Sequence, residues 1–383
     1  MNVHLYPSVL NNETRILKIA RSLRAYGVFA RIGVVGRDGP GLPAYEDLGD
    51  GIHLFRLAPV FGGTLEGVLG KVVRTIGWYL AVLGWMRARR VECLNCHSLP
   101  VLPLSALLKL WKRCTLVYDT HELETETHGT RGLRQRLAKL AEHSLIGCAD
   151  AVCVVNRSIG AWYEKTYGLA RVFVVYNLPR RMTAPPRRTG LLRQAIGLQP
   201  PDALLFIYQG MLSPGRGIEM LLAAFAGIGG DRHLVCMGYG PLEEQVQQAA
   251  QRNLNIHFLP AVVPNLVKDY TVDADVGLSL IENTCLSYYL CAPNKLYEYA
   301  ACGVAPVVSD FPEMGWFVDS HDCGWKVEPT TQALRATIES IDADTLAVRR
   351  ANAARAGAQY CWENEELELL RIYEALGLRH GTP

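Results

Sequence analysis

One segment in the later half of the chain combines glycines with a cation in a spacing that suits a phosphate ligand. The segment Tyr208–Glu219 follows an apolar run and opens a helix, and its glycines let backbone approach a ligand closely: Gly210, Gly215 and Gly217. The guanidinium of Arg216 offers a bidentate fork for a pyrophosphate. An ordinary strand–turn–helix connection with a surface arginine is the alternative.

A second segment, Ala292–Asp310, places Asn294 and Lys295 at a helix start and Glu298 three residues beyond Lys295. Residues at this spacing share a helix face. A cation and free amides hold a diphosphate, and a carboxylate one turn further accepts hydrogen bonds from ribose hydroxyls. A solvent-exposed lysine–glutamate pair is the alternative.

A third segment, Val117–Leu123, puts polar residues directly after an apolar strand. His121 is expected there as a hydrogen-bonding or proton-relaying group, with Asp119 and Glu122 able to orient it. A structural histidine in a loop is the competing interpretation.

Two possible metal motifs are weaker. Cys93 and Cys96 form a lone C-x-x-C without a second Cys or His pair at ligand spacing, which favours two buried strand cysteines. Asp273 and Asp275 form a D-x-D that is interpreted as capping the end of a helix. No metal site is predicted.

These motifs follow short β-branched runs that alternate with segments of helical periodicity, which predicts parallel sheets covered by helices. In the first helix Ile16, Ile19 and Leu23 share a face, and Asn11 and Asn12 are predicted to cap its start. The expected strands are Ala30–Val35, Thr115–Tyr118, Ala151–Val155, Val172–Tyr176, Leu204–Tyr208, Leu234–Met237, Val276–Leu280 and Ala305–Ser309.

The length of 383 residues, 49% of them apolar, suits two domains. A run rich in Pro and Arg, Leu178–Gly190, interrupts the periodicity and is interpreted as a linker. The expected organisation is a domain over 1–179, a linker over 180–190, a second domain over 191–358 and a C-terminal helical segment over 359–383. Ligands of two doubly wound domains bind beyond the strand ends, in a cleft where both sheets meet.

In order and spacing, the three motifs resemble the family-4 retaining glycosyltransferases of GT-B fold. The segment Pro293–Tyr299 is the most specific match, and the segments Asn12–Leu23, Asn95–Pro100, Tyr176–Pro179 and Gly238–Pro241 also resemble family features. The resemblance implies two Rossmann-like doubly wound domains facing across a cleft, with the C-terminal helix packing back on the N-terminal domain.

The resemblance also implies residue roles. Arg216 matches the basic residue on the donor diphosphate, Glu298 the second Glu of E-x7-E, and His121 the His that approaches the donor sugar. The catalytic set is therefore His121, Arg216 and Lys295; the donor-binding set is Gly210, Gly215, Gly217, Gly238, Tyr239, Glu282, Asn294 and Glu298; and the acceptor-side set is Asn12, Arg15, His97, Asp119 and Glu122.

Two positions depart from the family pattern. The first Glu of E-x7-E is replaced by Leu290, and the first basic residue of the phosphate loop by Met211. These changes keep a non-catalytic nucleotide-sugar-binding scaffold open as an alternative. Lys295 is expected to supply the missing positive charge.

Charge is divided unevenly along the chain. Residues 1–201 hold 27 Lys and Arg against 14 Asp and Glu, and residues 202–383 hold 12 against 23. A basic aromatic stretch over about 68–90 looks like an amphipathic helix for an anionic membrane surface, while Lys71 and Arg74 disfavour a membrane span. A core helix with a basic edge is the alternative. No nucleic-acid motif is found.

Together these features predict a cytoplasmic retaining glycosyltransferase, peripheral on the inner membrane face. It would move sugar from a nucleoside-diphosphate sugar to a lipid-linked saccharide or other glycan acceptor in surface polysaccharide or glycoconjugate synthesis. It would need no cofactor beyond that donor substrate. A nucleotide-sugar epimerase or hydrolase of similar fold is a further alternative.

Overall fold

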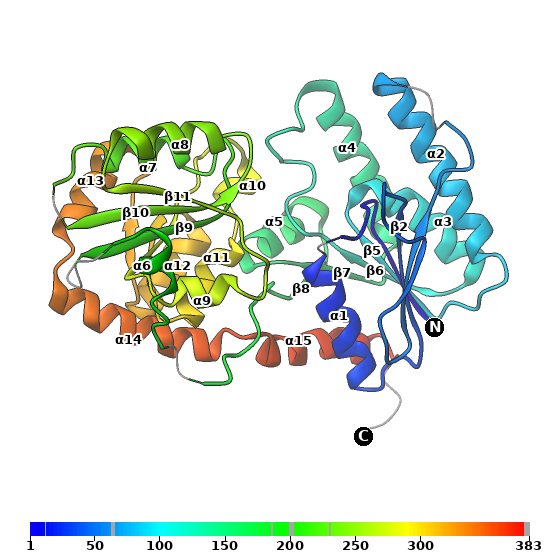
Figure 1. Cartoon of the computed structure of the whole chain (residues 1–383). Coiled ribbons are helices and arrows are strands. Elements are labelled where there is room, and N and C mark those ends of the chain that lie inside the picture. Colours follow the sequence, from blue (N-terminus) through cyan, green and yellow to red (C-terminus); the bar gives the residue numbers. More distant parts are fainter. Residues whose placement is uncertain (12, 63–65, 185–186, 199–202, 230, 379–383) are drawn as a thin grey trace. The chain divides into compact units, whose positions relative to one another are not determined.

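The computed structural model describes residues 1–11, 13–62, 66–184, 187–198, 203–229 and 231–378. The chain divides into two compact units, each built on one sheet (Figure 1). Unit 1 contains Met1–Tyr176 and the C-terminal residues from Glu366 on, and unit 2 contains Asn177–Glu365. This confirms the expected pair of α/β units.

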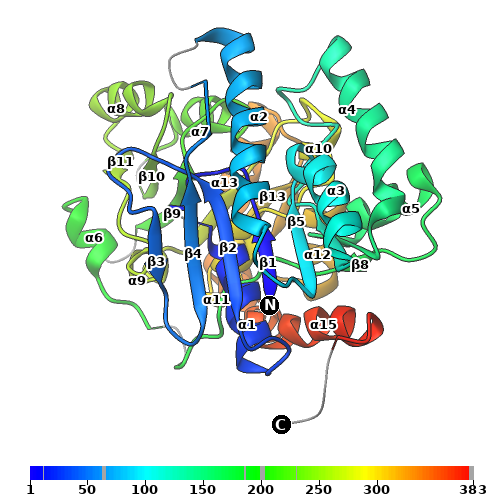
Figure 2. The ribbon, with the colours of Figure 1, turned by 90° about the vertical axis from the view of Figure 1, so that its right-hand side faces the viewer.

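Unit 1 has an eight-stranded sheet in the order β3-β4-β2-β1-β5-β6-β7-β8, parallel except for the β3–β4 pair. Figure 2 shows β3, β4, β2, β1 and β5 side by side. Its elements are β1 (Asn2–Leu5), α1 (Thr14–Ala25), β2 (Ile32–Arg37), β3 (Tyr45–Asp47), β4 (Ile52–Leu57), α2 (Gly67–Met86), β5 (Cys93–His97), η1 (Leu99–Val101), α3 (Leu102–Lys112), β6 (Thr115–Asp119), α4 (Gly132–Leu145), η2 (Ile146–Cys148), β7 (Ala151–Val154), α5 (Arg157–Tyr167) and β8 (Phe173–Val174).

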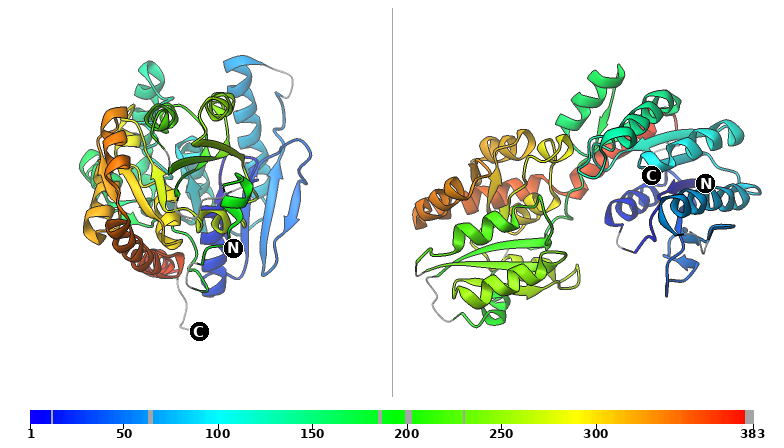
Figure 3. Two further views of the ribbon diagram at one scale, coloured as in Figure 1. Left: turned by 60° about the vertical axis from the view of Figure 1, so that its left-hand side comes forward. Right: turned by 90° about the horizontal axis from the view of Figure 1, so that it is seen from above.

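Unit 2 has a six-stranded parallel sheet in the order β11-β10-β9-β12-β13-β14. Figure 3 shows it from two further sides. Its elements are α6 (Leu191–Ala195), β9 (Leu204–Met211), α7 (Ile218–Phe225), β10 (Arg232–Tyr239), α8 (Glu243–Arg252), β11 (Ile256–Pro260), α9 (Val267–Thr271), β12 (Val276–Ser279), α10 (Leu286–Tyr289), α11 (Asn294–Ala301), β13 (Ala305–Ser309), α12 (Pro312–His321), β14 (Trp325–Val327), α13 (Thr331–Ser340), α14 (Ala343–Gln359) and the start of α15 (Trp362–Ala375).

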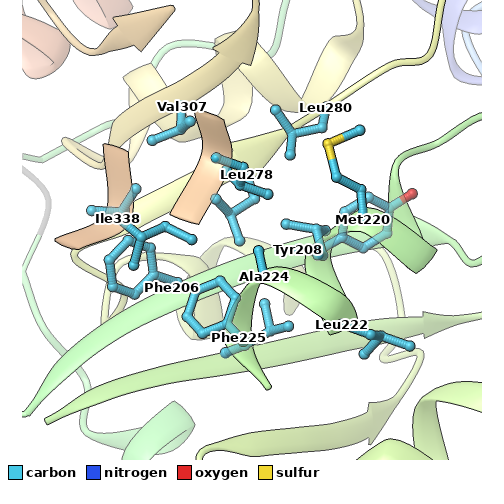
Figure 4. Packing of buried hydrophobic residues seen from close by; sticks show 14 of the residues in the cluster. Phe206, Tyr208, Met220, Leu222, Ala224, Phe225, Leu278, Leu280, Val307 and Ile338 are labelled. Carbon is cyan, nitrogen blue, oxygen red and sulfur yellow. The ribbon is translucent and has the colours of Figure 1, made fainter. Parts of the chain in front are cut away.

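Both faces of the unit 2 sheet are covered by apolar side chains. Along β9, Phe206 and Tyr208 belong to one buried cluster, whereas Leu205 and Ile207 belong to another. Because alternate residues of a strand point to opposite faces, the two clusters lie on opposite faces of the sheet. Figure 4 shows the first cluster, where Phe225 of α7 packs near Phe206. The ends of β9 and β12 are thereby fixed in position.

The C-terminal helix α15 joins the two units in sequence, and its residues from Glu366 on belong to unit 1. Glu366 accepts hydrogen bonds from Ser22 Oγ at 2.7 Å and from Tyr26 at 3.2 Å. Tyr373 is buried, and its ring meets Phe29 edge to face. The expected packing of the last helix on the N-terminal domain is confirmed.

One local prediction is wrong and a second is incomplete. Helix α1 begins at Thr14 with Glu13 at its N-cap, so Asn11 does not cap it, and Asn12 lies outside the described residues. Asp273 follows the end of α9, where its N–H donates to Tyr270 O at 3.2 Å, but its carboxylate accepts from the backbone N–H groups of Thr189 and Gly190 before α6. A side chain can reach a helix start far away in sequence, and no local pattern reveals this.

Helix α2 buries one face and exposes apolar side chains on the other. Trp78 is buried and donates through Nε1 to Gly36 O at 3.0 Å, whereas Val68, Leu69 and Val72 are exposed. Its 20 residues reach the length and mean hydropathy that a membrane-crossing helix needs, and 22% of its most apolar stretch is buried. Trp78 is thus one of the side chains through which α2 packs on unit 1.

Candidate active site

The loops after β9 and β12 meet at the topological switch point of the unit 2 sheet, where the strand order reverses. Glu282 N donates to Gly215 O at 3.0 Å, which ties the two loops together. A Cβ on Gly217 would lie 2.8 Å from Leu280 Cβ, and Gly217 has a φ of +73°. Gly217 is therefore required for the two loops to pack.

Lys295 lies in the first turn of α11, as the sequence predicts. Its Nζ sits 3.6 Å from the centroid of the Tyr208 ring. Burial, followed by repulsion from Arg216, lowers the pKa of Lys295 to about 7, although Glu298 acts in the opposite direction. Within the described residues it makes no ion pair. Lys295 is thus a partly neutral amine, and a bound anion would raise its pKa and favour the protonated form.

Arg216 approaches the same location from the β9 loop. Its guanidinium carbon lies 5.1 Å from the centroid of the Tyr288 ring, and its Nε is buried without a hydrogen-bond partner among the described residues. A buried N–H without a partner costs free energy. Two cations that repel each other, one of them with an unsatisfied donor, form a site that an anionic ligand would stabilise.

Glu298 is held in place by a residue that the sequence did not single out. Gln209 Nε2 donates to Glu298 Oε2 at 2.7 Å, and Gln209 Oε1 accepts from Thr271 Oγ1 at 2.6 Å. Gln209 is 4% exposed within the apolar run of β9. A polar residue at a buried strand position is the signal that could have revealed it.

The remaining donor-side residues spread over several loops of unit 2. Gly238 lies so close to β9 that a Cβ would fall 1.9 Å from Gly210 O, and Tyr239 beside it is 57% exposed. Asn294 accepts from Asn177 Nδ2 at 3.2 Å. Glu282 also lines an open hollow of about 540 Å³ beside α7.

The two departures from the family pattern have ordinary surroundings. Met211 ends β9 and is half exposed, and its carbonyl accepts from Tyr208 Oη at 2.7 Å. Leu290 follows α10 as its C-cap and is partly buried. Neither position places a charge near Lys295.

In unit 1 a buried polar cluster occupies the corresponding switch point, beside β1, β5 and β6. Arg15 donates two hydrogen bonds to Asp119, from Nη2 to Oδ1 at 2.6 Å and from Nε to Oδ2 at 3.2 Å. His97 Nδ1 lies 3.1 Å from Asp119 Oδ2. Although burial alone would raise it, Arg15 and then His97 hold the pKa of Asp119 well below its usual range.

His121 forms the exposed end of this cluster. Its side chain is 21% exposed, and its Nε2 lies 3.1 Å from His97 Nδ1. Burial, opposed by Asp119 and reinforced by His97 and Arg15, lowers the pKa of His121 to about 3. The ring is therefore neutral at physiological pH and suits a hydrogen-bonding role.

Three ligand atoms of His97, Asp119 and His121 lie close enough together to hold a metal ion. Arg15, however, already occupies both oxygens of Asp119. A divalent cation beside a fixed guanidinium is electrostatically unfavourable. The geometry therefore favours a hydrogen-bonded array over a metal centre.

The sequence analysis assigned Arg15, His97 and Asp119 to the acceptor side and His121 to the catalytic set, and the structure brings these four side chains together. Glu122 lies next to His121 in sequence but is exposed. Asn12 lies outside the described residues.

Glu124 was missed. It is in hydrogen-bonding contact with the backbone of Leu99 and His121, and burial followed by repulsion from Glu122 raises its pKa to about 8. It anchors the loop that carries His121.

Two sequence models match the chain. Residues 13–178 match the model described as "Glycosyl transferase 4-like domain", and residues 203–344 match "Glycosyl transferases group 1". The chain is 23% identical over 369 residues to chitobiosyldiphosphodolichol beta-mannosyltransferase of Kluyveromyces lactis, covering 87% of this chain and 80% of that protein. The models and this relative bear on activity as well as on fold.

Solved structures agree on the fold. Sucrose-phosphate synthase of Thermosynechococcus elongatus superposes with a TM-score of 0.81 at 17% identity, covering 98% of both chains. HepE of Anabaena in complex with UDP-glucose superposes with a TM-score of 0.73 at 16% identity, covering 98% of this chain and 99% of that chain. The expected architecture of two parallel-sheet domains is confirmed.

Proposed function

The chain belongs to the family-4-like glycosyltransferases of GT-B fold, and we propose that it transfers a sugar from a nucleoside diphosphate to a glycan acceptor with retention at the anomeric carbon. The observation that carries the donor assignment is the pair of cations at the unit 2 switch point. Lys295 has a pKa lowered to about 7, and Arg216 has a buried Nε without a partner among the described residues.

A diphosphate supplies what this pair lacks. Its oxygens would accept hydrogen bonds from Arg216 and from the backbone N–H groups at the start of α11. Its negative charge would favour the protonated form of Lys295. As the bond between the sugar and the diphosphate breaks, negative charge grows on the leaving oxygen. Preorganised cations stabilise that charge without further rearrangement. The cation pair thus serves both donor binding and leaving-group departure.

The carboxylate of Glu298 would bind the ribose of the donor nucleotide. It lies one turn after Lys295 on α11, and Gln209 fixes one of its oxygens. A fixed carboxylate accepts hydrogen bonds from the 2′- and 3′-hydroxyls together. This explains why Gln209 is buried in an otherwise apolar strand.

Retention follows the family resemblance, through a route in which the leaving phosphate helps to deprotonate the incoming hydroxyl on the same face. Leu290 provides no carboxylate nucleophile at its position. The Kluyveromyces relative is named for a β-linkage. NMR of the first-formed product therefore checks stereochemistry, and an anomeric configuration opposite to that of the donor would replace retention by inversion.

A lipid-linked saccharide is the proposed acceptor class, acting at the cytoplasmic face of a membrane. The Kluyveromyces relative is named for a dolichol-diphosphate-linked substrate. Helix α2 exposes Leu69, Val72 and Ile76, with Lys71 and Arg74 between them. Apolar side chains enter the interface while basic ones meet anionic headgroups.

Calorimetric titration with UDP, GDP, ADP and dTDP, followed by turnover of the matching sugars, tests the donor proposal. We expect one diphosphate to bind and its sugar to be transferred only when acceptor is present. Donor consumed without acceptor favours an epimerase or hydrolase. Tight binding without turnover on lipid-linked acceptors favours the scaffold alternative, and no binding by any diphosphate refutes the donor site.

A further inference from the structure

Unit 1 contains a continuous line of buried polar side chains that extends well beyond the residues already described. His4 of β1 pairs in register with Asn95 of β5, and His97 of β5 pairs with Asp119 of β6. All four side chains are at most 3% exposed. Because residues two apart share a face, Asn95 and His97 lie on the same face of the sheet. Polar residues in the middle of a buried sheet need a specific reason.

The proton positions along this line can be assigned from one end. Asp119 is ionised and only accepts, so His97 Nδ1, 3.1 Å away, carries a proton. An imidazole with its single proton on Nδ1 has a bare Nε2. His4 Nδ1 lies 2.8 Å from that atom and must donate to it.

The far end gives the same assignment independently. Burial, followed by repulsion from His97, lowers the pKa of His4 well below its usual value, so His4 is neutral and its Nε2 accepts. Asn95 Nδ2 donates to this Nε2 at 3.2 Å and to Asn2 Oδ1 at 3.1 Å, while Asn95 Oδ1 accepts from Tyr373 Oη at 2.7 Å. If His4 Nε2 carried the proton instead, the Asn95 amide would have to flip, and its Oδ1 would then face Asn2 Oδ1.

This directional line ends at His121. His97 Nδ1 has two acceptor atoms within hydrogen-bonding distance, Asp119 Oδ2 at 3.1 Å and His121 Nε2 at 3.1 Å. His121 Nε2 therefore accepts, and the proton of the neutral ring must be on Nδ1.

We infer that His4, Asn95 and Tyr373 are positioning residues that fix His121 in one tautomer, with its Nδ1–H available as a hydrogen-bond donor to a sugar hydroxyl. The sugar hydroxyl rests on the proposed function, whereas the tautomer does not. Tyr373 belongs to α15, so the last helix of the chain sets the chemistry of a loop that follows β6.

Histidine ring nitrogens labelled with ¹⁵N report the tautomer directly in the full-length protein without substrate. We expect His121, assigned by loss of its signals in His121→Gln, to be protonated on Nδ1 and bare on Nε2. In Tyr373→Phe, Asn95 loses its donor and can flip, so a second tautomer of His121 should appear. Protonation on Nε2 in the unmodified protein, or an unchanged pattern in Tyr373→Phe, would overturn the inference.

Tyr163→Phe is the matched control. Tyr163 is a buried tyrosine of the same unit, and its hydroxyl donates to Glu142 at 2.8 Å, outside the line of His4 and Asn95. We expect the His121 tautomer to stay unchanged in this variant. If Tyr163→Phe mixes the tautomers as much as Tyr373→Phe does, general loosening of unit 1 explains the effect and the inference fails.

Measurements of kcat test whether the tautomer of His121 matters for sugar transfer. Tyr373→Phe should lower kcat about three- to tenfold at an unchanged acceptor KM, and Tyr163→Phe should stay within about twofold. His4→Leu should lower kcat further, and His4→Asn, which keeps an N–H near the position of Nδ1, should restore part of it. If His121 shows the expected tautomer but the protein transfers sugar from no donor, the proposed function is refuted and the inferred tautomer stands. Transfer that is indifferent to Tyr373→Phe and His4→Leu sinks the positioning role.

Discussion

At the scale of single residues, the charge of Lys295 depends on what binds beside it. It sits over Tyr208 and is repelled by Arg216, which makes a free ammonium costly. Lys295→Met should weaken nucleoside diphosphate binding roughly 10- to 100-fold, because charge-assisted hydrogen bonds contribute about 1.5–3 kcal/mol. Calorimetric titration measures this.

The matched control is Lys268→Met, which removes an exposed cation from α9 of the same unit. It should bind diphosphate as the unmodified protein does. Equal losses in the two variants would mean that Lys295 acts only through the net charge of unit 2.

The lowered pKa of Lys295 also predicts a pH dependence of binding. Without ligand the amine titrates near pH 7, and a bound diphosphate raises its pKa. Below pH 7 the amine is charged in both states and affinity is insensitive to this group. Above pH 7 binding must take up a proton, so affinity falls, by at most about tenfold per pH unit.

Titrations between pH 7.5 and about 9 isolate this effect, because the diphosphate itself is then fully ionised. Lys295→Met should abolish the slope. A slope that survives in this variant assigns the proton to another group.

At the scale of elements, the connection between the β9 and β12 loops depends on one glycine. In Gly217→Ala the new Cβ meets Leu280 at a residue whose φ is +73°. The free energy of unfolding should fall by about 1–3 kcal/mol, and diphosphate binding should weaken as the loops separate. Denaturant titration and calorimetry measure the two effects.

Gly229→Ala serves as the control, since Gly229 has no positive φ and nothing within 4 Å of its added Cβ. Its stability should change by less than about 0.5 kcal/mol. Comparable losses in both variants would remove the special role given to the β9–β12 connection.

The exposed face of α2 makes a second prediction at this scale. Replacing Leu69 and Val72 together by Glu should reduce sedimentation with anionic liposomes at least about tenfold, because apolar burial is lost and charge repulsion is added. Leu254→Glu, at an apolar side chain of unit 2 that is 95% exposed, should leave sedimentation unchanged. If the double variant still pellets normally, α2 is not the membrane-binding element.

Sequence reasoning succeeded wherever a motif was local. Lys295 and Glu298 lie on one helix, and His121 follows a strand by two residues, so spacing alone was informative. It missed Gln209, because a glutamine inside an apolar strand shows no partner until Glu298 is folded against it.

It also missed His4 and Asn95. Their contact depends on the register of β1 against β5, strands about 90 residues apart in sequence. Register is set by tertiary packing, which no short motif encodes. The same reason explains why the distant helix start bound by Asp273 was not foreseen.

At the scale of the whole molecule, helix α15 is shared between two units that are otherwise continuous in sequence. A chain ending at Glu365 would lose several buried side chains, among them Ile372 and Tyr373. Each large buried apolar side chain contributes about 1.5–3 kcal/mol, a large fraction of a domain's net stability.

Hydrogen exchange of this shortened chain should therefore show lost protection in β1, β5 and β6. Strands β9 and β10, which belong to unit 2, are the internal reference and should keep theirs. Unchanged protection in β5 would show that unit 1 is stable without its last helix.

The position of Tyr373 has a consequence for biosynthesis. A ribosome releases β1, β5 and β6 long before it makes α15, and unit 2 is translated in between. The polar line through His4 and Asn95 therefore stays incomplete until Tyr373, 278 residues after Asn95, has been synthesised. Unit 1 reaches its final form only after translation has passed residue 373, so the nascent N-terminal segment at first lacks the Tyr373 hydroxyl in its interior.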